Sequence, residues 1–168
     1  MAIAGSGPAL LDAWGRVATD LRVSLTDRCT LRCTYCMPAG GLEWLPSDEI
    51  LTDHEVIRLI AIAVERLGVD QVRFTGGEPL IRRGLETVVA ATAALRTREG
   101  ARPRIALTTN GLLLEELAAP LFEAGLRRIN VHLDTLDPAR FRQITRRGGL
   151  RWWLRLPWER LLGRSSRR

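Results

Sequence analysis

Apolar positions along the chain follow two alternating spacings, which predict strands followed by helices. Residues Leu21 to Leu25 read Leu-Arg-Val-Ser-Leu, the period-two pattern of a short strand. Further on, Thr52 and Glu55 stand at the spacing of a capping box, and Gly68 stands where a left-handed residue ends a helix. Between them the apolar residues recur at the i, i+3, i+4, i+7 spacing of one buried helix face: Val56, Leu59, Ile60, Ala63, Val64 and Leu67.

The same strand-then-helix pattern recurs three more times. Strands are predicted over 71–75, 105–109 and 129–133, and helices over 82–98 and 113–124. A further helix is predicted to begin at Asp137-Pro138, a cap followed by a first-turn proline. Pro120 is expected to bend or restart its helix. The inward residues are expected to be Leu85, Val88, Val89, Thr92 and Leu95 in the first helix, and Leu114, Leu117, Leu121 and Phe122 in the second.

Strands that alternate with helices in this way are typical of parallel βαβ units, so the chain is predicted to be an α/β protein with right-handed connections. The unusual residues all follow predicted strands. The cysteines follow the first strand, Gly76-Gly77-Glu78 the second, Thr108 to Gly111 close the third, and Asp134 follows the fourth. Ligands bind at the carboxyl ends of parallel strands in barrels and open sheets. These segments are therefore expected to form one site.

All three cysteines, Cys29, Cys33 and Cys36, lie in one octet, CTLRCTYC. Three thiolates describe a metal site with one open position, as in an iron–sulfur cluster that takes three of its usual four cysteine ligands. A zinc site with His54 or His132 as the fourth ligand is an alternative, and unligated thiols are another. A disulfide framework does not fit an odd number of cysteines without an export signal.

Composition and charge limit the other possibilities. The length suits one ordinary domain, and neither a membrane span nor a signal peptide is recognised, so a cytoplasmic protein is expected. The net charge is +6 and every basic residue is an arginine, but +5 of it comes from the segment after Leu150. The remainder is nearly neutral, which indicates neither a nucleic-acid nor a membrane partner.

Five motifs in order carry a resemblance to a known family. They are LRVSLTDRC (21–29), YCMP (35–38), VRFTGGEPL (72–80), TTNG (108–111) and INVHLDTLD (129–137). The Cys-x3-Cys-x2-Cys spacing followed by Gly-Gly-Glu-Pro resembles the radical S-adenosylmethionine superfamily. The surrounding residues are similar to its GTP 3′,8-cyclase family, which begins molybdenum cofactor biosynthesis. The fold implied is a partial (β/α) barrel, truncated to about its first four βα units.

The resemblance also implies cofactors. Cys29, Cys33 and Cys36 would hold a 4Fe–4S cluster whose free iron binds S-adenosylmethionine, and an electron from a cellular donor would then release a 5′-deoxyadenosyl radical. Tyr35 would contact the adenosyl part through its backbone, and Gly77 the methionine amino group. His132 stands where the family often has a serine that helps to bind S-adenosylmethionine.

GTP would be the substrate by the same resemblance. Arg22, Arg73 and Thr108 match family positions that contact it, and guanidinium groups suit phosphate or purine oxygens. The alternative for these two arginines is an ordinary surface position in an arginine-rich chain.

The resemblance runs from about residue 12 to 147, and the family's chains are about twice this long. The predicted organisation is an N-terminal lead-in (1–20), a radical S-adenosylmethionine core domain that is an incomplete barrel (21–147), and a divergent Arg/Trp-rich tail (148–168). The tail is interpreted as out of frame or truncated, with a membrane- or nucleic-acid-binding segment as the alternative. The chain is therefore predicted not to carry out GTP cyclisation. It is also predicted to self-associate. Whether the chain is an enzyme, a non-catalytic cluster-binding fragment or a zinc module stays open.

Overall fold

The computed structural model describes residues 9–150 and shows four parallel strands in one sheet. In spatial order these are β1 (Asp20–Ser24), β2 (Gln71–Thr75), β3 (Arg104–Thr109) and β4 (Arg128–Val131). The strand order follows the chain order, and all three pairings are parallel, with Arg22 opposite Arg73 and Thr108 opposite Asn130. The predicted α/β architecture of four consecutive βα units is confirmed.

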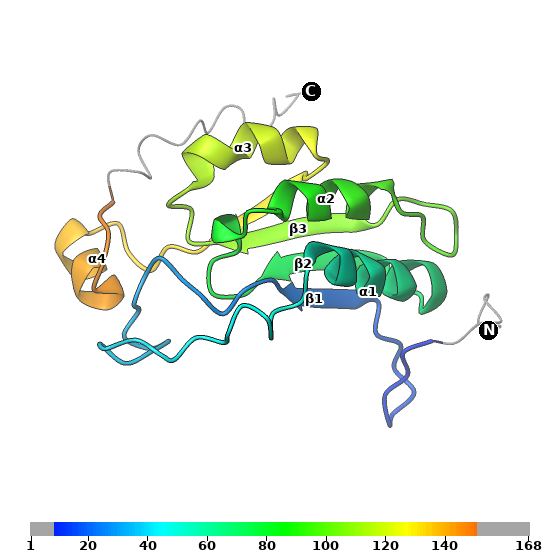
Figure 1. Ribbon diagram of the computed structural model, residues 1–168, viewed down its shortest axis with the longest axis horizontal. Coiled ribbons are helices and arrows are strands. Elements are labelled where there is room, and N and C mark those ends of the chain that lie inside the picture. The colour runs from blue at the N-terminus through cyan, green and yellow to red at the C-terminus, as the bar shows by residue number, and fades with distance from the viewer. Residues whose placement is uncertain (1–8, 151–168) are drawn as a thin grey trace.

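Within residues 9–150, four α-helices accompany the strands. Figure 1 shows α1, α2 and α3 on one side of the sheet. Their bounds are α1 Asp53–Arg66, α2 Leu85–Ala94, α3 Leu114–Glu123 and α4 Pro138–Thr145, with a short 3₁₀ turn, η1, over Pro79–Ile81. In the same view α4 lies apart from the other three, beyond the carboxyl ends of the strands. Its backbone contacts the cysteine loop, described below.

The signals at both ends of α1 are confirmed. The Thr52 hydroxyl accepts a hydrogen bond from the Glu55 backbone N–H, and the Glu55 carboxylate accepts one from the Thr52 N–H at 2.8 Å. Gly68 follows the helix with a φ of +81°. The expected burial of Leu59 is wrong, because its side chain is 53% exposed at the margin of the buried stripe.

The second helix is shorter than predicted, since residues 82–84 and 95–98 lie outside α2. Arg82 is not helical because its side chain is directed back to the start of α1 and the end of β1, where it bonds Asp53 and the Leu25 carbonyl. At the other end Leu95 is extended. In α3, Phe122 was expected inside but is 56% exposed, where the Arg127 guanidinium stacks on its ring.

The two faces of the sheet differ. Apolar side chains of all four strands pack against α1, α2 and α3 and form the main core, which includes Val72, Phe74 and Leu107. The other face, here called the open face, carries polar side chains, and none of the described helices α1 to α3 packs on it. Its residues include Arg22, Ser24, Arg73, Thr75 and Thr108.

Two further expectations meet the limits of the described chain. No helix within residues 9–150 has the length and apolarity required to cross a bilayer. The predictions made for the tail, 148–168, fall almost wholly on residues 151–168, which lie outside the described residues.

Asp137 gives α4 an acid-sensitive start. Its carboxylate accepts hydrogen bonds from the backbone N–H groups of Arg140 and Ala139, which lower its pKa below the usual 3.8. Stability from a lowered pKa is present above the unfolded value and is lost as pH falls through the folded one. Asparagine caps equally well without titrating. We expect Asp137→Asn to lose less melting temperature than the wild type between about pH 5 and about pH 3 in a thermal melt. Equal losses would contradict this.

Candidate functional site

The cysteine loop runs from the end of β1 through residues 26–38, with its three thiols free and close together in sequence. Cys33 is buried, Cys29 is partly exposed and Cys36 is exposed. A tight turn brings the N–H groups of Cys36 and Met37 onto the Cys33 carbonyl at 3.0 and 3.1 Å. The loop also bonds the end of α4, where the Arg32 N–H reaches the Thr145 carbonyl at 2.9 Å. A small apolar cluster of Leu31, Cys33 and Phe141 closes the same contact.

The Gly76-Gly77 turn after β2 holds the start of this loop by its backbone. Gly77 donates to the Thr26 carbonyl and Glu78 to the Arg28 carbonyl, both at 2.8 Å. A Cβ on Gly77 would lie well under 3.0 Å from the Arg28 carbonyl, and one on Gly76 equally close to the Thr26 carbonyl. Glycine is therefore required because the cysteine loop itself approaches the turn. The contact of Gly77 with a methionine amino group stays a prediction.

Three side chains join the cysteine loop to the end of β4. The Tyr35 hydroxyl donates to the Asp134 carboxylate at 2.9 Å and lies 3.0 Å from Nε2 of His132. His132 is also 3.2 Å from Asp134. The structure thus brings together Tyr35 and His132, two residues for which the resemblance implies contacts with S-adenosylmethionine. Asp134 bonds both of them.

A buried carboxylate joins the ends of β2 and β3. Glu78 is fully buried and accepts hydrogen bonds from the Thr109 hydroxyl and the Asn110 backbone N–H at 2.7 and 2.8 Å. Burial raises the pKa of Glu78, and these hydrogen bonds oppose that rise. Sequence reasoning named Glu78 and Asn110 only as parts of motifs, because their contact depends on the register between two strands.

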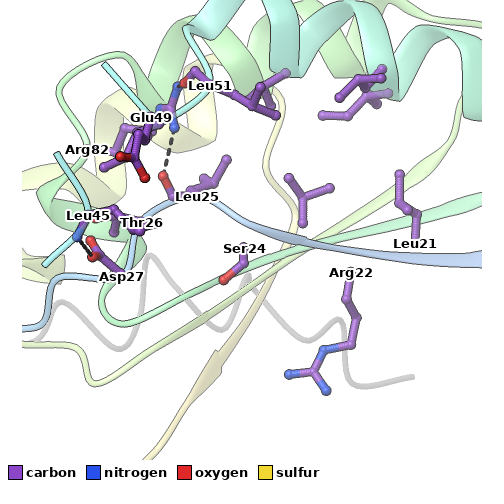
Figure 2. Close-up of a pocket in the computed structure, with 15 residues that line it drawn as sticks. Leu21, Arg22, Ser24, Leu25, Thr26, Asp27, Leu45, Glu49, Leu51 and Arg82 are labelled. Atoms are coloured by element: carbon purple, nitrogen blue, oxygen red, sulfur yellow. Dashed lines mark hydrogen bonds between the residues drawn. The ribbon is translucent and has the colours of Figure 1, made fainter. Parts of the chain in front are cut away.

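The residues expected to contact GTP share the open face. Arg22 and Arg73 are direct neighbours across β1 and β2, and Thr108 follows Ala106, the partner of Arg73, by two residues. Figure 2 shows Arg22 and Ser24 on the opposite side of β1 from Leu21 and Leu25, which face the core. Arg73 bonds the Asp20 carboxylate at 2.8 Å. The open face therefore presents adjacent guanidinium groups, one of them partly neutralised.

The cysteine loop fits a thiolate centre in its donor chemistry. Burial raises the pKa of the Cys33 thiol, a hydrogen bond with Tyr35 opposes that rise, and the charges of Cys36, Asp134 and Cys29 add to it, so a cation beside Cys33 would favour its thiolate. In this arrangement, however, no group of three or more Cys, His, Asp or Glu side chains within residues 9–150 is placed to hold a metal ion. The three cysteines together with His54 or His132, the predicted zinc ligands, are likewise not grouped to hold a metal ion in this part of the chain.

A hollow beside this region lies behind β1, between that strand, α1 and residues 45–51. It has a volume of about 460 Å³ and is lined mainly by apolar side chains such as Leu25, Leu51 and Ile60 (Figure 2). No cysteine lines it, although Arg22 and Ser24 of β1 are among its lining residues. We place the candidate site at the strand ends and on the open face, because the cysteine loop and the other predicted site residues lie there.

Known proteins resemble this chain in both sequence and fold. Residues 23–156 match the family described as the Radical SAM superfamily, and the chain belongs to that superfamily. By fold it is similar to SuiB of Streptococcus suis, solved with its precursor peptide SuiA, with a TM-score of 0.55 and 22% identity over 82% of this chain and 29% of that one.

Within the superfamily, the chain is similar to GTP 3′,8-cyclases. It is 63% identical to that of Corynebacterium glutamicum over 84% of this chain and 37% of the relative, and 61% identical to that of Mycolicibacterium smegmatis over 88% and 41%. The chain therefore spans about 40% of the length of these curated relatives.

Proposed function

We propose that this chain is the S-adenosylmethionine-cleaving portion of a GTP 3′,8-cyclase-type enzyme of the cytoplasm. Cys29, Cys33 and Cys36 would hold a 4Fe–4S cluster, and S-adenosylmethionine would bind beside it. The observation that supports this most is that the cysteine loop is bonded directly to the Gly76-Gly77-Glu78 turn. That contact places the two motifs of the superfamily at one edge of the sheet.

A bound cluster would supply one-electron reducing chemistry toward S-adenosylmethionine. The chain's own residues bind and orient. Tyr35, Gly77 and His132 would contact S-adenosylmethionine, and the hydrogen bonds of Tyr35 and His132 with Asp134 hold two of them against one another. Arg22, Arg73 and Thr108 would contact GTP on the open face. Preformed positions of this kind reduce the entropy that binding costs.

Anaerobic reconstitution of the 168-residue chain tests the proposal. After addition of dithionite and S-adenosylmethionine, we expect 5′-deoxyadenosine by liquid chromatography, and none from Cys33→Ser. Iron and sulfide without 5′-deoxyadenosine would indicate a non-catalytic cluster-binding fragment. Zinc without sulfide would overturn the proposal in favour of a zinc module. We expect no cyclised GTP, because the chain spans about 40% of the relatives' length.

GTP binding is expected to depend on Arg22. A charge-assisted hydrogen bond contributes about 1.5–3 kcal/mol, so Arg22→Ala should weaken GTP binding roughly tenfold to a hundredfold in calorimetric titration. Arg83→Ala, an exposed arginine in the segment between η1 and α2, is the matched control. Equal GTP affinities of the two variants would show that Arg22 does not contact GTP.

The isolated chain is also proposed to self-associate. Within the described sheet, β1 and β4 each pair on one side only, which leaves backbone groups able to pair with another chain. We expect species larger than a monomer on gel filtration. A monodisperse monomer with a cooperative melt would contradict this.

A further inference from the structure

The side chain of Asn110 lies between the end of β3 and the cysteine loop. Its amide nitrogen is 3.8 Å from the Cys29 sulfur and 2.9 Å from the Thr30 hydroxyl. Its amide oxygen accepts a hydrogen bond from the Leu112 backbone N–H at 3.0 Å. Because the oxygen is occupied by a donor, the NH₂ group is the end that faces the cysteine loop.

The Glu78 carboxylate holds the Asn110 backbone by a hydrogen bond. One carboxylate oxygen accepts the Asn110 N–H, and the other accepts the Thr109 hydroxyl and the Leu80 N–H at 2.7 and 3.0 Å. Three donors thus converge on two oxygens in a fully buried position. A neutral amide of the same shape would turn an NH₂ group toward at least one of these donors and leave it unpaired.

The same residue also holds Cys29 from the other side. The Glu78 backbone N–H donates to the carbonyl of Arg28, which directly precedes Cys29. Glu78 therefore positions Cys29 in two ways. Its backbone N–H bonds the peptide carbonyl that precedes Cys29, and its carboxylate holds Asn110, whose amide contacts the Cys29 sulfur. Cys33 and Cys36 have no such contact with the end of β3 among the described hydrogen bonds.

We propose that Asn110 donates an N–H···S hydrogen bond to the cluster-binding sulfur of Cys29, and that Glu78 is the positioning residue that keeps the donor there. The proposal rests on the cluster binding proposed above. Hydrogen bonds to ligand sulfurs help to set the reduction potential of an iron–sulfur cluster, because they stabilise the negative charge that the sulfurs carry after reduction. The Asn110 donor thus makes the cluster easier to reduce.

Two substitutions at Asn110 separate a donor from a spacer. Asn110→Asp keeps the shape of the side chain and the acceptor for the Leu112 N–H, replaces the donor and adds a negative charge. Asn110→Ser keeps a turn acceptor but does not extend to the sulfur. In anaerobic redox titrations followed by electron paramagnetic resonance, both are expected to shift the midpoint potential to more negative values. A wild-type potential in Asn110→Ser would overturn the proposal, and so would a shift in Asn110→Asp no larger than that caused by a carboxylate added elsewhere, because a spacer role predicts both results.

Glu78→Gln tests the positioning role. Losing the carboxylate by itself shifts the midpoint potential to more positive values, so the shift to more negative values that we expect would come from the displaced donor. Glu115→Gln, the same chemical change on the exposed surface of α3, is its control. Asn130→Asp on β4 controls for the added charge at Asn110. Potentials of Glu78→Gln and Glu115→Gln that coincide would show that Glu78 does not position the donor. Thermal melts before reconstitution verify that each variant is folded.

A second measurement applies to the metal-free chain. If the wild type binds no iron and sulfide, the proposed function fails, yet the contact at Cys29 can still be tested by iodoacetamide labelling and mass spectrometry. Asn110→Ser and Glu78→Gln are expected to increase the labelling rate of Cys29 severalfold, because the amide no longer covers the sulfur, and to leave Cys36 unchanged. An unchanged Cys29 rate in both would overturn the contact itself.

Discussion

Replacement of Gly77 by alanine is expected to displace the cysteine loop and to abolish most cluster binding. The new Cβ would lie well under 3.0 Å from the carbonyl of Arg28, a backbone atom that cannot rotate away as a side chain can. Relief requires that the loop and the turn separate, which breaks the hydrogen bonds of Gly77 with Thr26 and of Glu78 with Arg28. Overpacking alone costs about 1–3 kcal/mol, and two lost backbone hydrogen bonds add about 1–3 kcal/mol.

Iron and sulfide content after anaerobic reconstitution measures this effect, together with the melting temperature of the metal-free protein. Gly40→Ala is the matched control, because it makes the same change close to the cysteine loop, where a Cβ meets no atom within 4 Å. We expect wild-type iron in Gly40→Ala and little in Gly77→Ala. Comparable iron in the two variants would show that the close approach of loop and turn is not needed for the site.

The elements themselves were predictable because local signals specify them. The capping box at Thr52, the cap at Asp137 and the glycine after α1 are each complete within a few residues, and each is found where it was expected. Periodicity also identified which strands alternate with which helices. It failed at the margins of the buried stripes, at Leu59 and Phe122, because a spacing pattern cannot show how far the neighbouring element extends.

The candidate site was predictable in its parts and not in its contacts. Consecutive strand ends bring the cysteines, the Gly76-Gly77 turn and Asn110 to one edge, as the βαβ pattern implies. The sequence suggested that the glycines make room for a cofactor, which stays a prediction, and the structure adds a second reason for glycine, the close backbone of the cysteine loop. The Glu78–Asn110 contact depends on the β2–β3 register. The start of α2 depends on Arg82, the residue after η1, whose side chain bonds Asp53.

Arg82→Met is expected to destabilise the protein more than any change at an exposed arginine. The Arg82 side chain is only 11% exposed, and its guanidinium bonds the Asp53 carboxylate at 2.8 Å. It also bonds the carbonyls of Leu25 and Leu51, at 2.7 and 2.8 Å, two residues that Figure 2 shows beside it. It thereby joins the end of β1 to the start of α1. Methionine keeps the apolar stem and removes every donor.

Breaking a buried ion pair costs about 3–5 kcal/mol, and because Asp53 is 38% exposed we discount this to about 2–3 kcal/mol. A chain of this length loses about 2–4 °C of melting temperature per kcal/mol, so the melting temperature should fall by about 4–12 °C. Arg83→Met, at the exposed neighbouring position, should change the free energy of unfolding by no more than about 0.5 kcal/mol. Arg82→Lys should recover only part of the loss, because one ammonium group cannot reproduce the guanidinium fork. Melting temperatures of Arg82→Met and Arg83→Met that agree would show that the strand end and the helix start are held together by packing instead.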